Sequence, residues 1–264
     1  MSIKVNIRRI IFVCLWVLAG TGMVVLLIAA VNSRTHQVCR GYEINIKTAK
    51  NQNERFIDKN DIVNVLTSNK KLALKNRAIK SFDLNKIESR LAREVWVSDA
   101  ELFFDNNGIL KVNVSERQPV ARIFTTSGES FYIDSNCKKL PLSGKASAKL
   151  TVFTGYPFSA RKTFDGEKKL LKQIRNLSTY LAKDNFWNAQ VAQVDITPAR
   201  DFEIVPTVGN HLIEFGTADS IEAKFRRLMI FYQQVLAKTG MEKYDRIKVQ
   251  YHQQVIGVKE HDNN

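Results

Sequence analysis

The sequence predicts an α+β protein with one N-terminal transmembrane helix, a small domain of β-α-α-β-β order, and a mostly antiparallel β domain with two helices. Three observations support this prediction. An uncharged apolar run comes first, at residues 10–31. Two short helical segments then lie between strand-like runs, within residues 42–118. From residue 119 onward, short alternating strands dominate, and two longer amphipathic helices interrupt them.

The apolar run "IIFVCLWVLAGTGMVVLLIAAV" has 22 residues. At about 1.5 Å per residue, a helix of this length crosses a hydrocarbon core of about 30 Å. A cleaved signal peptide is the alternative, but its apolar region normally has only about 7 to 15 residues. Lys4, Arg8 and Arg9 precede the run. We therefore expect a cytoplasmic stub at residues 1–9, an uncleaved span, and translocation of the large C-terminal part.

Residues 32–41 form a short polar connector to the first domain. In "YEINIK", at 42–47, apolar and polar residues alternate as in a half-buried strand. A short helix is expected near residues 58–69, capped by Asp58 or Asn60, and a second one after Asp83. Trp96, where the second helix ends, is expected in a core.

A hairpin is expected next, because "VSDAELFF" and "ILKVNVSE" flank the turn-forming "DNNG" at residues 105–108. Phe103 and Phe104 are adjacent in the first of these strands, so they must point to opposite faces. Glu116 and Arg117 at the end of the second strand are expected to be solvated, with Pro119 fixing the direction in which the chain leaves. The stretch "SERQP" thus joins the two domains.

The second domain is expected to be a succession of short strands interrupted by two helices. Leucine and isoleucine side chains lie on one side of the first helix, and Gly240 terminates the second. The expected strands are 120–124, 131–134, 139–142, 150–155, 191–196, 202–206, 211–216, 246–251 and 255–259, and the expected helices are 166–184 and 220–240.

No residue pattern indicates an enzyme or a metal site. The three cysteines, Cys14, Cys39 and Cys137, form no CxxC pair, and the four histidines have no metal-ligand spacing. GxSxG, HExxH and Gly-rich phosphate loops are absent from the sequence. The net charge of +14 favours anionic surfaces without identifying one.

A cationic cluster invites a nucleic-acid interpretation, but no aromatic residues interleave it, so a solvated helix face is the simpler explanation. The cluster consists of Arg161, Lys162, Lys168, Lys169, Lys172 and Arg175.

The chain resembles the FtsQ/DivIB family of bacterial cell-division proteins over nearly its whole length. The resemblance rests on the succession of "DLNKIESRLAREVWVSDAEL", "GILKVNVSERQPVA", "YIDSNCKKLPL", "NHLIEFGTADSIEAKFRRL" and "DRIKVQY". The residue pattern of "VGNHLIEFG" is most similar to the pattern in family members from Bacteroidetes.

The resemblance implies a POTRA domain at 42–118 and an FtsQ-type β domain at 119–264, both periplasmic, on a protein of the inner membrane at the division septum. It also implies a scaffold without catalysis or cofactor, acting on no nucleic acid and no small-molecule substrate. Its partners would be FtsB/DivIC-like and FtsL-like division proteins, and their assembly would help to control septal peptidoglycan synthesis.

The partner-binding residues are expected in the terminal run "IKVQYHQQVIGVK", because a strand near a chain end presents unpaired backbone groups. In this interpretation Tyr251, Gln253, Val255 and Gly257 alternate toward the partner, with Gln254 beside them. Arg200 corresponds to a basic contact of the family. The alternative is that Tyr251 and Val255 pack in the core together with Ile247, Val249 and Val258, and that Arg200 is an exposed arginine without a role.

Three positions depart from the family pattern. Val95 stands where a proline is frequent, and Lys248-Val249-Gln250 replaces an acid and an arginine before Tyr251. Cys137 replaces a glycine in a turn, which predicts a left-handed backbone at a non-glycine residue.

Two other functions stay open at this point. One is an envelope secretion or assembly chaperone that handles unfolded strands through the edge of the first domain. The other is a cell-wall hydrolase, which we would detect by turnover of peptidoglycan.

Overall fold

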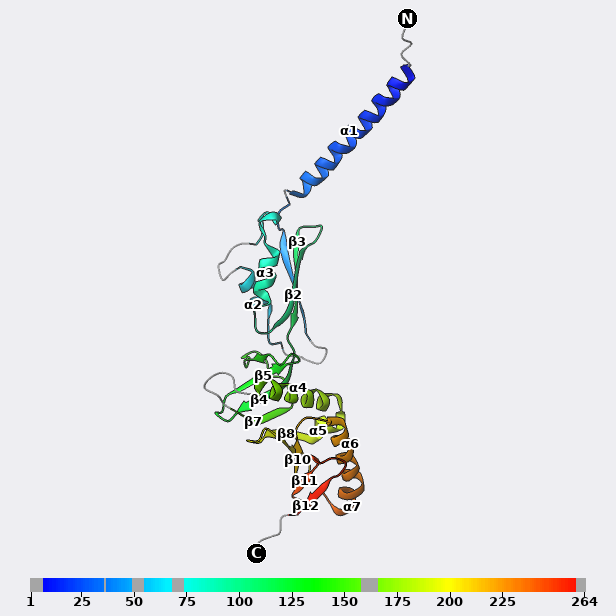
Figure 1. Cartoon of the computed structure of the whole chain (residues 1–264). Coiled ribbons are helices and arrows are strands. Elements are labelled where there is room, and N and C mark those ends of the chain that lie inside the picture. The colour runs from blue at the N-terminus through cyan, green and yellow to red at the C-terminus, as the bar shows by residue number, and fades with distance from the viewer. Residues whose placement is uncertain (1–6, 36, 49–54, 68–73, 158–165, 260–264) are drawn as a thin grey trace. The chain divides into compact units, whose positions relative to one another are not determined.

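The computed structural model describes residues 7–35, 37–48, 55–67, 74–157 and 166–259. Its contacts divide the chain into two compact units. Unit 1 comprises Met1–Lys47 and Asp58–Ser115, and unit 2 comprises Thr48–Ile57 and Glu116–Asn264. Figure 1 shows both, with many of the elements labelled.

The first element of unit 1 is the helix α1 (Ile7–Thr35). Its segment from Ile10 to Leu27 is apolar and long enough to cross a membrane, and none of that segment is buried inside the protein. Exposed leucine, valine, phenylalanine and tryptophan side chains throughout this segment are costly in water, and they suit a lipid environment. The prediction of an apolar N-terminal helix is confirmed.

The rest of unit 1 is a three-stranded sheet with two helices. The order along the chain is β1 (Gly41–Lys47), α2 (Lys59–Leu66), the 3₁₀ turn η1 (Ile79–Ser81), α3 (Leu84–Leu91), β2 (Val97–Phe104) and β3 (Ile109–Glu116). In the sheet the order is β1-β3-β2, and β1 runs parallel to β3. The predicted strand-helix-helix-strand-strand order is confirmed.

Local side-chain hydrogen bonds explain why these elements begin and turn where they do. Asp58 and Asp61 form a reciprocal capping box at the start of α2, and Asp83 accepts the Lys86 N–H at the start of α3. In the turn between β2 and β3, Asp105 Oδ1 accepts a backbone N–H of Ile109 at 2.8 Å.

The core of unit 1 lies between the two helices and one face of the sheet. Trp96 is buried there, as predicted. Phe104 packs edge-to-face on Phe82 at 5.2 Å between ring centroids, whereas its neighbour Phe103 is 43% exposed. The two adjacent phenylalanines therefore point to opposite faces of the sheet, as predicted.

Unit 2 is built on a nine-stranded sheet with the order β12-β11-β10-β9-β8-β7-β4-β5-β6. Five of its eight pairings are antiparallel, and β4–β7, β7–β8 and β10–β11 are parallel. The strands are β4 (Pro119–Thr125), β5 (Ser130–Asp134), β6 (Lys139–Leu140), β7 (Val152–Tyr156), β8 (Val191–Ile196), β9 (Phe202–Pro206), β10 (Leu212–Gly216), β11 (Arg246–Lys248) and β12 (Ile256–Val258).

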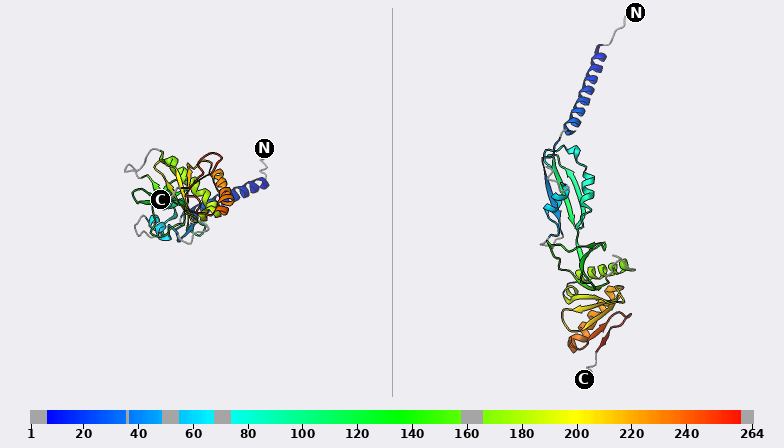
Figure 2. Two further views of the ribbon diagram at one scale, coloured as in Figure 1. Left: turned by 90° about the horizontal axis from the view of Figure 1, so that it is seen from below. Right: turned by 90° about the vertical axis from the view of Figure 1, so that its left-hand side faces the viewer.

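Helices of unit 2 pack against this sheet, and Figure 2 shows them in a second view. They are α4 (Glu167–Lys183), α5 (Asn185–Gln190), α6 (Ile221–Phe231), the π-helical turn η2 (Tyr232–Leu236) and α7 (Ala237–Thr239). One hydrophobic cluster joins Leu170 and Ile174 of α4, Phe225 of α6 and strand residues such as Ile204. Gly240, with φ 92°, follows α7 as the predicted helix terminator.

Helix α5 is an addition to the two predicted helices. Asp184 ends α4 and at the same time caps α5, accepting the N–H groups of Phe186 and Trp187 at 3.0 and 3.1 Å. The cap turns the chain so that Trp187 enters the core, where it is 2% exposed. Aspartate is a typical residue at a helix start, but Asp184 also ends α4, so the sequence does not show that a second helix begins there.

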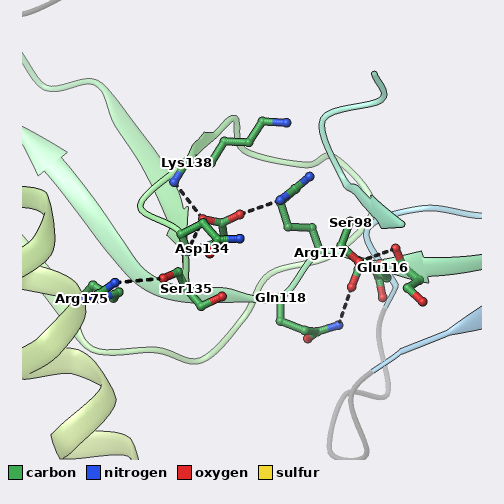
Figure 3. Close-up of polar contacts among 10 residues, drawn as sticks. Ser98, Glu116, Arg117, Gln118, Asp134, Ser135, Lys138 and Arg175 are labelled. Atoms are coloured by element: carbon green, nitrogen blue, oxygen red, sulfur yellow. Dashed lines mark hydrogen bonds and ion pairs between the residues drawn. The ribbon is translucent and has the colours of Figure 1, made fainter. Parts of the chain in front are cut away.

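The stretch around Glu116 corrects one prediction. Glu116 is only 4% exposed, and its Oε1 accepts the backbone N–H groups of Phe56 and Ile57. Arg117 donates to the carboxylate of Asp134 at 2.7 Å, as Figure 3 shows. The prediction that Glu116 and Arg117 are solvated is wrong, because the distant segment at Phe56 supplies two N–H donors and β5 supplies a carboxylate.

The cationic cluster of the sequence is only partly described. Lys168, Lys169 and Lys172 are exposed on α4, and Arg175 donates to the Ser135 carbonyl at 3.4 Å. Arg161 and Lys162 lie outside the described residues.

Candidate functional site at the C-terminal sheet edge

The last strand, β12, forms one edge of the nine-stranded sheet. It pairs antiparallel with β11, with Gly257 opposite Ile247. Among the described strands β12 has no neighbour on its other side. Backbone N–H and C=O groups on such a side are available to a further strand.

A tight contact holds β12 in place. A Cβ atom on Gly257 would lie 2.6 Å from Cδ1 of Tyr244, so the ring occupies the space that any other residue would need. The N–H of Asp245 donates to the carbonyl of Val258 at 3.0 Å. Gly257 is therefore required by packing within the chain, in addition to any role toward a partner.

The segment before β12 is a turn, at the position of the predicted connection between the last two strands. Tyr251 is 42% exposed, and Gln253 has a left-handed φ of 62°. This residue reverses the chain so that β12 can fold back on β11. The regular strands cover only Arg246–Lys248 and Ile256–Val258, so Tyr251 and Val255 lie just outside the strands in which they were predicted.

The side chains at this edge divide into buried and exposed sets. Ile247 and Val249 are fully buried, and Val255 packs against the same core, as the alternative interpretation expects. Gln253 and Gln254 are exposed. Ile256, which was not singled out in the sequence, is 38% exposed. Ile256 and Tyr251 together form the exposed apolar surface of this edge.

Arg200 lies in the turn between β8 and β9, away from β12. Its backbone is left-handed, with φ 69°, and its guanidinium lies against Gly166. The turn shares one end of the sheet with residue 250, because Phe202 pairs with Gly216 and Gly216 touches Gln250. Residues 251–257 lie together at the edge, whereas Arg200 stands next to β9, and the strands β10 and β11 separate β9 from β12.

Arg227 supports the edge and was missed in the sequence. It projects from α6, and its Nη2 donates to the carbonyls of Val249 and Tyr251 at 3.1 and 3.2 Å. The two carbonyls lie directly after β11, where the chain leaves the sheet. A helical arginine 22 residues before its partner has no local sequence signal.

Charged side chains connect β9, β10 and β11 beside the edge. Glu214 pairs with Arg246 at 3.1 Å and with Lys248 at 3.2 Å, and Glu203 lies 3.5 Å from Arg246. Lys248, which stands in the segment that departs from the family pattern, is therefore engaged inside the sheet.

A buried polar pair lies between β10 and the π-helical turn. The His211 Nε2 is 2.7 Å from the hydroxyl of Tyr232, and both residues are buried. Burial lowers the pKa of His211 and raises the pKa of Tyr232 to about 12. A neutral imidazole sealed from solvent is suited to holding the π turn, and its ring has no access to a substrate.

Metal chemistry finds no support at this site. Within the described residues, no group of three or more His, Cys, Asp or Glu side chains could hold a metal ion.

Comparison with known proteins gives one result for each domain and one for the chain. A family model described as "FtsQ/DivIB, C-terminal related" matches residues 118–258, which is more than half of the chain. A model described as "POTRA-like domain" matches residues 37–115. The Cell division protein FtsQ of Salinibacter ruber is 25% identical over 176 residues, covering 64% of this chain and 67% of the relative. The chain belongs to the FtsQ/DivIB family of cell-division proteins.

Proposed function

We propose that this protein is a non-enzymatic scaffold of the division complex that binds FtsB/DivIC-like and FtsL-like proteins by accepting a strand at β12. Through these partners it would help to control septal peptidoglycan synthesis. The observation that carries the proposal is the position of β12 as the last strand of a nine-stranded sheet, with Ile256 and Tyr251 exposed. An extended partner segment gains main-chain hydrogen bonds at such an edge.

The charges around β12 favour an acidic partner segment. Lys243 and Lys259 are both exposed, and the side-chain hydrogen bond and the positive charge of Lys243 lower the pKa of Lys259, although the Asp245 carboxylate acts in the opposite direction. Two like charges this close repel each other, so a carboxylate placed between them relieves the repulsion. We expect Asp or Glu in the partner strand that reaches this end of β12.

The proposed topology is a single pass through the inner membrane with a cytoplasmic N-terminus. The POTRA domain at 42–118 and the β domain at 119–264 would then be periplasmic and located at the septum. Lys4, Arg8 and Arg9 before the span support this orientation. The matches to the FtsQ/DivIB and POTRA-like family models, together with the apolar helix, support the membrane-anchored division role.

The test is titration of the full-length protein in nanodiscs with the periplasmic segment of the organism's FtsB/DivIC-like protein. Ile256→Asp places a charge on the exposed edge, and we expect it to weaken binding at least about tenfold, or 1.4 kcal/mol. Val208→Asp is the matched control, because Val208 is also exposed, at 53%, and lies at another part of unit 2. A chain truncated after Gln250 should lose binding completely.

The outcomes separate the possible sites. Loss with Ile256→Asp and retention with Val208→Asp support strand addition at β12. If both variants bind equally well, the binding site lies elsewhere than at this edge. If the wild-type protein does not bind, the FtsB/DivIC-like protein is not its partner.

A further inference from the structure

Three chain segments of unit 1 meet directly after the apolar helix. We call them the juxtamembrane cap, which comprises residues 37–40, 74–80 and 105–108. Backbone hydrogen bonds hold the cap together. They join Cys39 N to Arg77 O (2.8 Å), Asn76 N to Cys39 O (2.7 Å), Ile79 N to Gln37 O (3.0 Å) and Arg40 N to Gly108 O (2.9 Å).

Chain length alone places the cap at the level of lipid headgroups. The apolar run ends at residue 31, and α1 continues to Thr35. Those four extra residues rise about 6 Å, which is about the thickness of the headgroup layer on one side of a bilayer. Gln37 is two residues further on and can lie at most about 7 Å from Thr35. The first residue of the cap therefore lies within about 7 Å of the end of α1, whatever the angle between α1 and the sheet.

The cap is strongly cationic. Arg40, Lys75, Arg77 and Lys80 are all exposed. The one acid within its three segments is Asp105, whose carboxylate accepts the N–H groups of Asn107 and Ile109 and lies 3.9 Å from Lys111. Four cations thus face solvent at this end of the domain, and the single carboxylate is already engaged.

The cap borders a cavity of about 300 Å³ in the same unit. Three cations, Arg77, Lys86 and Arg90, line it. Of the lining residues, only Asp83 is acidic, and its carboxylate is used to cap α3. A cavity of this size with a cationic wall can receive a phosphate-bearing headgroup.

The guanidinium of Arg77 is held in position at the junction of cap and cavity. Its Nε donates to Ser81 Oγ at 2.9 Å, and its Nη2 donates to the Ser81 carbonyl at 3.0 Å. The group also lies 4.8 Å from the ring centroid of Phe82. An arginine has five N–H donors, so this arrangement orients the fork for an anion before the anion arrives.

We infer that the juxtamembrane cap binds the phosphate groups of anionic phospholipids in the leaflet where α1 leaves the membrane. Arg40, Lys75, Arg77 and Lys80 supply the charge, and the cavity beside Arg77 receives one headgroup. The contact ties the POTRA-like domain to the bilayer surface. This inference goes beyond partner binding at β12 and requires only that α1 spans a membrane.

The test uses the full-length chain in two kinds of nanodisc, one of phosphatidylcholine and one containing phosphatidylglycerol. Hydrogen exchange of the amides of residues 74–82 is measured in both. We expect slower exchange in the anionic discs. Each cation near an anionic surface strengthens binding about fivefold at ordinary salt, so Lys75→Gln with Lys80→Gln should remove most of the difference.

The matched control is Lys168→Gln with Lys169→Gln, which changes the charge equally on exposed residues of α4. We expect this control to keep the protection. Salt at 1 M, where the Debye length is about 3 Å, should abolish it. Inorganic phosphate added to phosphatidylcholine discs should give none, which distinguishes a lipid headgroup from a free anion.

Equal exchange in the two discs would overturn the inference, as would protection by inorganic phosphate alone or equal loss in the α4 control. Titration with the FtsB/DivIC-like segment in the same discs reports on β12 separately. Lost lipid protection with retained partner binding would therefore reject the cap and leave the scaffold proposal standing.

Discussion

Arg117 and Asp134 form an ion pair of 2.7 Å in which the two side chains are only 12% and 3% exposed. The carboxylate also accepts the N–H groups of Asn136 and Lys138 at 2.8 Å each. Asp134 thereby fixes the turn after β5, in which Cys137 has a left-handed φ of 62°. The Asp134 carboxylate therefore connects Arg117, the first residue after β3, to a turn in which Cys137 adopts a conformation that favours glycine.

Arg117→Ala should lower the unfolding free energy by about 3 kcal/mol, because it leaves a buried carboxylate without its cation. Urea unfolding of the full-length protein in detergent, followed by tryptophan fluorescence, measures the change. Arg226→Ala is the control, since Arg226 pairs with Glu222 while both are at least 70% exposed. That variant should cost less than about 1 kcal/mol. Equal effects of the two variants would show that the burial of Arg117 does not matter.

Glu116→Ala should release the segment at Phe56. The variant removes the acceptor of two backbone N–H groups, and an unsatisfied buried donor costs about 1–3 kcal/mol. Hydrogen exchange at Phe56 and Ile57 should become faster, whereas Glu116→Gln, which keeps a carbonyl oxygen, should remain closer to the wild type. Unchanged exchange in the alanine variant would refute this role of Glu116.

The stability of unit 2 should fall as the pH drops below about 6.5, the ordinary pKa of histidine. Burial lowers the pKa of His211 in the folded state, so the unfolded state takes up the proton first. Stability from this group is thus fully present above pH about 6.5, and it is lost as the pH falls toward the lowered folded value. Urea unfolding at a series of pH values should show the decline.

His211→Gln should flatten that decline, although it lowers stability at every pH. His252→Gln is the control, because His252 is exposed in the turn before β12. A slope that persists in His211→Gln, or disappears in His252→Gln, would assign the pH dependence to another group.

Gly257→Ala should destabilise the edge strand by about 1–3 kcal/mol, the usual cost of inserting a methyl group into filled space. The methyl carbon would lie 2.6 Å from the ring of Tyr244. In a Tyr244→Ala background the same change should cost much less. Gly144→Ala, with no atom within 4 Å of the new carbon, should stay within about 0.5 kcal/mol. Additive effects of Gly257→Ala and Tyr244→Ala would contradict this explanation.

The parts of the fold that follow from neighbouring residues were predictable. Asp58 and Asp83 cap their helices from the preceding position, and the Asp105–Gly108 turn closes the hairpin with its own side chain. The left-handed Cys137 was also predictable, because the family has glycine there. Such features need only a few residues of context, which a single sequence contains.

The features that were missed depend on residues far apart in the chain. Glu116 is buried by partners 59 and 60 positions earlier, and Arg227 reaches carbonyls 22 and 24 positions later. At the candidate site, the turn at residues 252–254 between the two terminal strands was predicted, but the strands themselves are shorter than predicted and cover Arg246–Lys248 and Ile256–Val258. Burial of Val255 and exposure of Ile256 follow from where that turn places them.

The parallel pairing of β1 and β3 constrains the order in which unit 1 can form. Gly41 pairs with Ile109, 68 positions later, and the register runs to Lys47 and Ser115. During synthesis, β1 is made long before the strand that completes it, and closing such a long loop is slow. Until residue 115 is available, the first strand after the apolar helix has no partner in its own domain. A chaperone that recognises unpaired strands would therefore find both sides of residues 41–47 open during that interval, whereas afterwards β3 covers one of them.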